Sequence, residues 1–318
     1  MSQGRSPIAE LHVHLGGCLD YRGCLALLLT LDDPHWGHYE ASYHSAFGVP
    51  SPARAIVDAV RRGDVGAEAA FRTIFEFRDA DGGRFARFQA KFDLINVAFG
   101  LTESGWSNWN EAQTIAAFLA LEAQIQTVQQ SQGLDLVETR VFLRGAPVER
   151  ARAVLSALLG ACATPRGGPR RQMVLSLDRA DPWPHWTMVE ELALSPQGPH
   201  LIGVDFCNVE EGHPPKQKSA FFRRLRQFNA EHPTRALALL YHVGESFNDK
   251  SIESAIRWVV EIAEAGAHRL GHAIALGIDP DHFGCHQRTE SVAERLDQIE
   301  YELAHSDALM RCGARVDP

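Results

Sequence analysis

The strongest constraint on the fold is a regular alternation of two kinds of segment along the chain. Short apolar runs rich in β-branched residues recur six times and are typical of buried strands. They are residues 8–15, 134–143, 173–177, 201–206, 236–243 and 269–276. Between them lie segments whose apolar residues are three and four apart, the spacing of one helix face. These are residues 19–31, 109–131, 148–163, 221–230 and 251–265. Such an alternation predicts an α/β fold of parallel strands joined by crossover helices.

The segment between the first and second predicted strands is unusually long. Residues 39–131 are too apolar and too helix-like for a simple loop, so we expect inserted helices there, including residues 53–62 and 67–77. Four further apolar residues in this segment could line the rim of a pocket or pack in an ordinary core: Phe85, Phe88, Phe92 and Ile95.

The size of the chain allows one large barrel or two ordinary domains. It has 318 residues, of which 45% are hydrophobic and 22% charged. No internal repeat is visible, and only residues 164–171 have the proline and glycine content of a flexible connection. A single continuous domain over residues 1–318 is therefore the simpler interpretation.

Composition narrows the partners and the compartment. The net charge of −9 disfavours a broad grip on a phosphate backbone, so duplex nucleic acid is not an expected partner. No apolar run approaches the roughly 18 residues that span a bilayer, and the polar N-terminus leaves no room for a signal peptide. The six cysteines form no C-x-x-C pair, which argues against a disulfide framework or a cysteine zinc knuckle. We expect a soluble, cytoplasmic protein.

Two histidines end the first predicted strand. His12 and His14 are two residues apart, so their side chains would point to the same side of a strand. Gly16 and Gly17 follow directly, which places both rings at the carboxyl end of the strand, where barrels of this kind build their sites. The pair therefore predicts two ligands that converge on one metal ion.

Two later strand ends carry groups of the same chemistry. His242 closes the fifth run and is followed by Val243-Gly244-Glu245, so an imidazole and a carboxylate lie together. Neutral imidazole suits zinc, and Glu245 can transfer a proton beside the metal without binding it. His272 ends the sixth run, where it could orient the attacking water or stabilise a developing oxyanion.

These motifs, in this order, resemble those of the adenosine deaminases, from residue 8 to about residue 277. The motifs are His12-Val13-His14, His242-Val243-Gly244-Glu245 and Arg269-Leu270-Gly271-His272, with Gly203-Val204-Asp205-Phe206 similar to the family's fourth strand. The resemblance implies a (β/α)8 TIM-type barrel with one Zn²⁺ per chain, held by His12, His14 and His242. It also implies that Glu245 protonates the purine ring nitrogen and that His272 assists the attacking hydroxide.

The implied reaction is the hydrolytic deamination of adenosine or a related adenine nucleoside or nucleotide, with release of ammonia. We expect His14, Gly17 and Asn208 to contact this substrate. Two positions depart from the family pattern: Gly16 stands where an aspartate for the sugar is usual, and Asn208 stands where a glycine faces the purine.

The C-terminal part also departs from the family, because no aspartate pair follows His272 and residues 291–310 are helix-like. Strands one to six are visible and strands seven and eight are not, so we expect an incomplete barrel. Its unpaired edges predict self-association, or assembly with a missing C-terminal segment. Gly16-Gly17-Cys18 and residues 276–280 also resemble larger adenosine-deaminase-like antiviral proteins of bacteria, of which this chain would be the N-terminal part.

Two other functions remain open at this point. One keeps the metal barrel but changes the substrate to another purine-like or cyclic amide compound, which Gly16 and Asn208 favour. The other is a barrel without catalytic activity that binds a nucleotide or assembles with partners, which the missing aspartates favour. Measured metal content separates the barrel without catalytic activity from the two enzyme hypotheses. A substrate panel separates the adenine deaminase from the amidohydrolase with another substrate.

Overall fold

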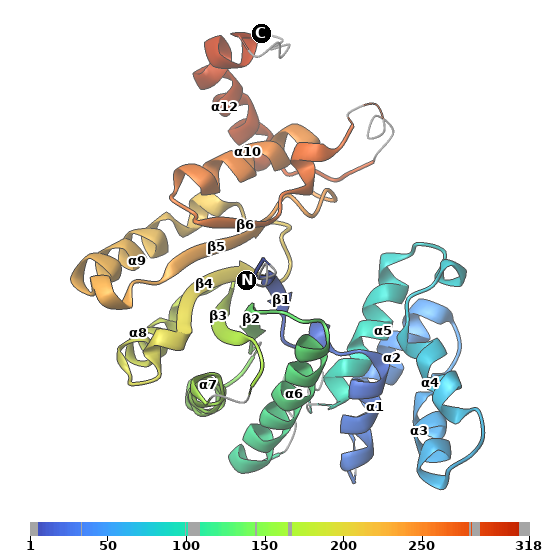
Figure 1. The fold of residues 1–318 in the computed structure, drawn as a ribbon. Helices are drawn as coiled ribbons and strands as arrows, with labels where there is room; N and C mark the ends of the chain where they lie inside the picture. The colour runs from blue at the N-terminus through green and yellow to red at the C-terminus, as the bar shows by residue number, and fades with distance from the viewer. Residues whose placement is uncertain are drawn as a thin grey trace. The chain divides into compact units, whose positions relative to one another are not determined.

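A computed structural model describes residues 6–32, 34–98, 100, 109–143, 145–164, 167–279, 281 and 287–311. Six strands alternate with helices along the chain (Figure 1). They are β1 (Ala9–His14), β2 (Leu136–Phe142), β3 (Arg170–Asp178), β4 (Leu201–Cys207), β5 (Ala238–Val243) and β6 (Arg269–His272). All six predicted strands are confirmed. The last is shorter than expected, because a 3-10 turn over Ile274–Gly277 follows it.

The strands are neighbours in chain order, β1-β2-β3-β4-β5-β6. The pairs β1 with β2, β4 with β5 and β5 with β6 are parallel, and in the last of these His242 is opposite Gly271. This sequential parallel order confirms the predicted α/β fold of the incomplete (β/α)8 type. Within the described residues there is no seventh or eighth strand.

The crossover helices lie where the apolar periodicity predicts them. They are α1 (Tyr21–Thr30), α6 (Glu111–Ser131), α7 (Val148–Ala163), α9 (Ser219–Glu231) and α10 (Ile252–Glu264), followed by the C-terminal α12 (Val292–Arg311). A capping box of Asn110 and Gln113 begins α6, and the Ser251 side chain caps the first turn of α10. The helix α8 (Trp186–Leu194) was not predicted, because its nine residues are too short for a clear period.

The long segment after β1 consists of inserted helices, as expected. They are α2 (Gly37–Phe47), α3 (Ala53–Arg62), α4 (Ala67–Phe75) and α5 (Phe85–Ala98). The helix α2 packs on α5, and α3 packs on α4. Tyr39, Phe71 and Leu94 are fully buried among these helices, so the insertion has a core of its own. No helix in the described part of the chain is long and apolar enough to cross a membrane.

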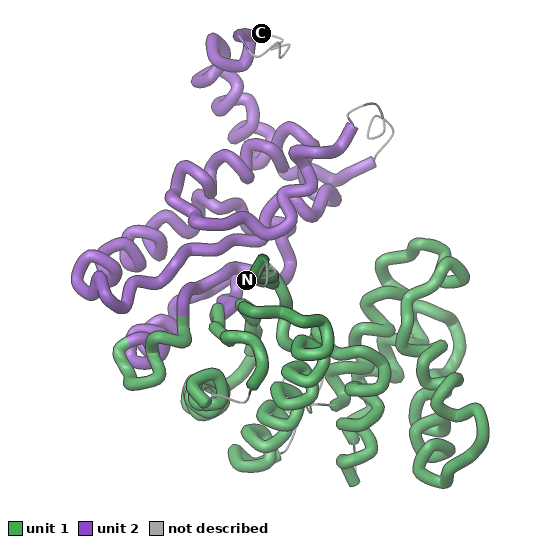
Figure 2. Tube along the Cα trace, viewed as in Figure 1, with its two compact units in different colours: residues 1–174, 194–201 green, residues 175–193, 202–318 purple. Residues whose placement is uncertain are grey.

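The chain divides into two compact units, shown in Figure 2. Unit 1 contains residues 1–174 and 194–201, and unit 2 contains residues 175–193 and 202–318. The boundary crosses β3 between Val174 and Leu175. That residues 1–318 form a single domain stays a prediction.

The core of unit 2 is aromatic and lies beneath the ends of β4 and β5. Phe206 stacks on Tyr241 with ring centroids 5.2 Å apart, and the Phe221 ring meets Phe206 edge-on at 5.3 Å. These contacts hold the two strands together one residue before Cys207 and His242. Cys18, Cys24, Cys162 and Cys207 are free thiols, as predicted, whereas Cys285 and Cys312 lie outside the described residues.

Candidate active site

His12 and His14 lie on β1 in unit 1, and their rings are adjacent. The ring centroids are 5.9 Å apart and the planes are inclined by 52°, as expected for residues i and i+2 of a strand. The end of β1 is fixed to β2, because the buried guanidinium of Arg140 donates to the carbonyl of Leu11 at 2.9 Å. The Leu15 amide in turn donates to the carbonyl of Arg140 at 2.8 Å.

Gly17 lies beside His14 at a point where α5 approaches. A Cβ built at Gly17 would be 3.9 Å from Cβ of His14 and 3.9 Å from Cε2 of Phe92. Phe88 stacks on Phe92 with ring centroids 6.3 Å apart. Two stacked aromatic rings of α5 therefore lie near Gly17, which is one of the predicted substrate residues and is next to another, His14. Ile95, by contrast, is buried in the core.

His242 is the predicted metal ligand at the end of β5, and a buried carboxylate orients it. Its Nδ1 is 3.0 Å from Oδ1 and 2.9 Å from Oδ2 of Asp205, which has no exposed surface. The Phe206 amide also donates to Oδ1 of Asp205 at 2.8 Å. A carboxylate at Nδ1 selects the tautomer whose lone pair is on Nε2, the usual arrangement behind a zinc-bound histidine. Sequence analysis assigned no role to Asp205, although a charged residue inside an apolar strand is a signal.

Glu245 and His272 meet next to His242 in unit 2. Nε2 of His272 is 3.0 Å from Oε2 of Glu245. The His242 and His272 rings have centroids 5.1 Å apart, and a ring nitrogen of one lies within 4.8 Å of a ring nitrogen of the other. The structure therefore brings together three of the residues that the sequence selected from two separate strand ends.

Arg179 holds the other oxygen of the Glu245 carboxylate. Its Nη2 donates to Oε1 of Glu245 at 3.1 Å, and its guanidinium lies 5.4 Å from the centre of the Tyr241 ring. The side chain is almost fully buried. Arg179 directly follows β3, and sequence analysis missed it because one arginine after a strand carries no spacing signal.

The loop after β5 is held by a second residue that sequence analysis missed. The buried carboxylate of Glu210 accepts three backbone N–H bonds, from Gly244 at 2.9 Å, Glu245 at 3.0 Å and Ser246 at 2.9 Å. Gly244 itself is required: its φ is 68°, and a Cβ there would be 3.1 Å from Cγ2 of Val259. Glu210 thus fixes the direction in which Glu245 leaves the backbone.

In the part of the chain that the structure describes, left-handed backbone occurs at three residues other than glycine, all at strand ends of this site. Asn208 has φ 79°, His272 has φ 62° and Ala273 has φ 49°. Such conformations cost energy and concentrate at functional sites. At Asn208 the conformation explains the departure noted above, since the resembled family has glycine there and asparagine is one of the few residues that tolerate it.

Two thiols near the predicted residues are poor nucleophiles. Burial raises the pKa of the Cys207 thiol to about 12 and that of the Cys18 thiol to about 12. Cys18 donates from Sγ to the carbonyl of His14 at 3.2 Å. Both side chains stay protonated near neutral pH, which argues against catalysis by a cysteine nucleophile.

Comparison with known proteins finds a local similarity to adenosine deaminases. No family model matches the chain. Over 93 residues, however, it is 33% identical to the adenosine deaminases of Mycobacterium bovis and Mycobacterium tuberculosis. This is a local similarity to the adenosine deaminases. The match covers 29% of this chain and 22% of each relative, so it spans about a fifth of the relatives' length.

Two solved structures have a similar arrangement of the chain. An amidohydrolase from Burkholderia ambifaria, solved with bound zinc, has a TM-score of 0.46 at 14% identity, over 87% of this chain and 62% of its own. The N6-methyl-AMP deaminase of Arabidopsis thaliana has a TM-score of 0.48 at 15% identity, over 84% of this chain and 64% of its own.

Proposed function

We propose that this chain is a zinc-dependent hydrolase that deaminates an adenine nucleoside or nucleotide and releases ammonia. The observation that carries the proposal is the contact between Glu245 and His272 beside His242. The carboxylate of Asp205 orients His242 through Nδ1. Hydrolytic deamination of a purine needs a proton donor, a group that orients water and a metal in one place. The local similarity to adenosine deaminases supports the same reaction.

His12, His14 and His242 would hold one zinc ion per chain. All three are imidazoles at the ends of parallel strands, and imidazole is a preferred zinc donor. The fit is supported by Asp205, whose carboxylate holds Nδ1 of His242 in the way that carboxylates behind zinc ligands do. When bound, zinc supplies Lewis-acid activation of the attacking water.

The protein's own groups then move the proton and hold the substrate. Protonated Glu245 would give its proton to the purine ring nitrogen beside the reacting carbon, and Arg179 would hold the resulting carboxylate through Oε1. His272 hydrogen-bonds the other oxygen and orients the attacking water. His14, Gly17 and Asn208 contact the substrate.

The test is conversion of substrate by the purified 318-residue chain after loading with one equivalent of zinc, with substrate and product separated by chromatography. Ammonia is the second product of the unmethylated adenine compounds, methylamine is that of the N6-methylated one, and a cyclic amide would open without releasing either. The substrate panel contains adenosine, adenosine monophosphate, N6-methyladenosine monophosphate and a cyclic amide. Turnover of an adenine compound that requires zinc supports the proposal. Turnover of the cyclic amide alone would support the wider amidohydrolase alternative. Binding of nucleotide without turnover or zinc would support the assembly alternative.

We also propose that the chain self-associates or pairs with further strands. Within the described residues the sheet has six strands where the resembled barrel has eight, and unpaired strand edges favour association. Sedimentation velocity at several protein concentrations tests this. A single monomeric species across the range, with full activity, would contradict it.

A further inference from the structure

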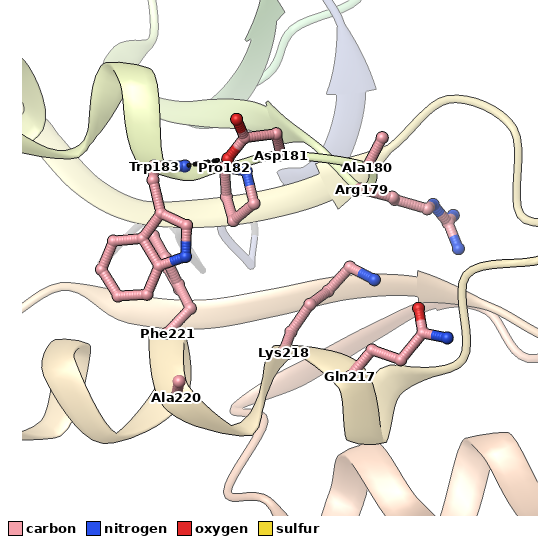
Figure 3. Close-up of a pocket in the computed structure, with 9 residues that line it drawn as sticks. All are labelled: Arg179, Ala180, Asp181, Pro182, Trp183, Gln217, Lys218, Ala220 and Phe221. Atoms are coloured by element: carbon pink, nitrogen blue, oxygen red, sulfur yellow. Dashed lines mark hydrogen bonds between the residues drawn. The ribbon is translucent and has the colours of Figure 1, made fainter.

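A pocket in unit 2 is lined in part by Arg179, the residue that donates to Glu245. It is lined by the turn after β3 and by the start of α9, as Figure 3 shows. Trp183 and Phe221, whose rings meet edge-on at 5.3 Å, form one end. Arg179 and Lys218 extend toward the other end, beside the Gln217 amide. The pocket is thus aromatic at one end and cationic at the other.

The cationic end contains two buried charges. Lys218 is 4% exposed and Arg179 is 2% exposed. Nη2 of Arg179 is used by Glu245, but Nε and Nη1 are buried and have no hydrogen-bond partner. No carboxylate among the described residues forms an ion pair or a hydrogen bond with the Lys218 side chain. Buried cations of this kind are costly unless an anion or water satisfies them.

The surrounding charges give Lys218 little compensation for its burial. Burial, followed by the positive charge of Arg179, lowers the pKa of Lys218 to about 8, against a smaller opposite effect of Asp178. Burial and then Lys218 also lower the pKa of the neighbouring His213. Asp181, the carboxylate in the lining, is exposed and accepts from the Trp183 amide at 3.2 Å. Near neutral pH the pocket therefore holds a protonated lysine and an arginine with unused donors.

We propose that this pocket binds a phosphate group, with Lys218 and the Nη1 atom of Arg179 as its donors. A phosphate offers several acceptor oxygens, and a protonated lysine and a guanidinium N–H group both form strong charge-assisted hydrogen bonds to such oxygens. Phosphate binding at this site needs neither zinc nor deaminase activity, and it is separate from the function proposed above.

The size of the pocket favours a small ligand. Its volume is about 110 Å³, enough for a few water molecules at roughly 30 Å³ each. Sites for drug-sized ligands begin at roughly 300 Å³. Free inorganic phosphate fits this description, and the phosphate group of a nucleotide is the other source of the same chemistry.

A bound phosphate would share the Arg179 guanidinium with Glu245. The carboxylate takes Nη2, and the phosphate would take Nη1. Two anions on one cation oppose each other, so removing the Glu245 charge should tighten phosphate binding. This coupling links occupation of the pocket to the residue that we assign to proton transfer.

The test is calorimetric titration of inorganic phosphate into the full chain at pH 7, without zinc or substrate. We expect one saturable site per chain. Lys218→Met should weaken binding by about ten-fold or more, the effect of losing one charge-assisted hydrogen bond. Lys218→Arg should stay within a few-fold of the parent, and Glu245→Gln should bind more tightly.

Lys216→Met is the matched control, because Lys216 lies on the same turn but is half-exposed and pairs with Asp297. It should bind phosphate like the parent, and circular dichroism should show all variants folded. The proposal fails if the parent shows no saturable binding, if Lys218→Met binds like the parent, or if Lys216→Met weakens binding equally. Since no turnover is measured, these failures are distinct from failure of the proposed deaminase.

Two further titrations identify the source of the phosphate. If a nucleotide supplies it, adenosine monophosphate displaces inorganic phosphate and Lys218→Met weakens the nucleotide about ten-fold, while adenosine binding is unchanged. If free phosphate is the ligand, the substitution leaves both nucleotide and nucleoside binding unchanged. Either pattern supports the site, and equal weakening of adenosine would overturn it.

Discussion

Glu245 is held from both sides: Nε2 of His272 is 3.0 Å from its Oε2, and Nη2 of Arg179 is 3.1 Å from its Oε1. The three residues come from the ends of β5, β6 and β3. A carboxylate fixed in this way has one orientation, which a proton donor to a bound ring needs, since proton transfer requires hydrogen-bond distance and alignment.

Replacing Glu245 by glutamine should leave the fold and zinc content unchanged and reduce turnover by about a hundred-fold or more. The amide has the same shape but no transferable proton. Ammonia release from adenosine and elemental analysis measure the two quantities. Near-parental turnover by a folded, zinc-loaded variant would exclude Glu245 as the acid.

Replacing both His12 and His14 by alanine should abolish zinc binding, because only one of the three proposed ligands remains. Zinc per chain, measured by elemental analysis after dialysis, is the readout. The matched control replaces His232 and His305, which lie on α9's end and on α12. The control should keep about one zinc per chain. If the variant without His12 and His14 kept as much zinc as the control, the ligand assignment would be wrong.

Glu210→Ala should destabilise the loop that carries Glu245. Three backbone N–H groups lose their acceptor, and leaving even one buried donor unpaired costs about 1–3 kcal/mol. We expect a lower free energy of unfolding together with a fall in turnover. Glu211→Ala is the control, since Glu211 accepts from the side chains of Ser246 and Asn248 instead. Chemical denaturation and ammonia release should show a smaller effect for the control.

The stability of the folded chain should rise with pH between about 8 and 10.5 because of Lys218. Its pKa is about 8 in the folded protein against an ordinary 10.5, so the unfolded chain binds more protons in this range. The free-energy cost of burying the charged lysine is fully present below pH 8, and it is on the order of 3 kcal/mol.

Lys218→Met should therefore unfold less readily at pH 7 and lose this part of the pH dependence, as measured by urea denaturation across the range. Saturating phosphate should reduce the same dependence in the parent, because it stabilises the charged lysine. An unchanged pH profile in the Lys218→Met variant would show that another group is responsible.

Much of the fold followed from local patterns. The strands were predicted because short apolar runs, bounded by polar turns, have little alternative to burial in a sheet. The bounds of α3 and α7 matched the structure because their apolar spacing is strong and their ends are clear. Likewise His12, His14, His242, Glu245 and His272 could be selected because each stands at or just beyond the end of a strand-like run, where this architecture builds its sites.

Only the tertiary structure showed what holds these residues. Asp205 lies 37 positions before its partner His242. Glu210 and Arg179 lie 35 and 66 positions before Glu245, which both of them contact. A contact between residues so far apart depends on how strands and loops pack, and it has no period or spacing in the sequence. The same applies to Lys218, which is a surface residue by its type and became buried beside Arg179 only because the turn before α9 folds against the end of β3.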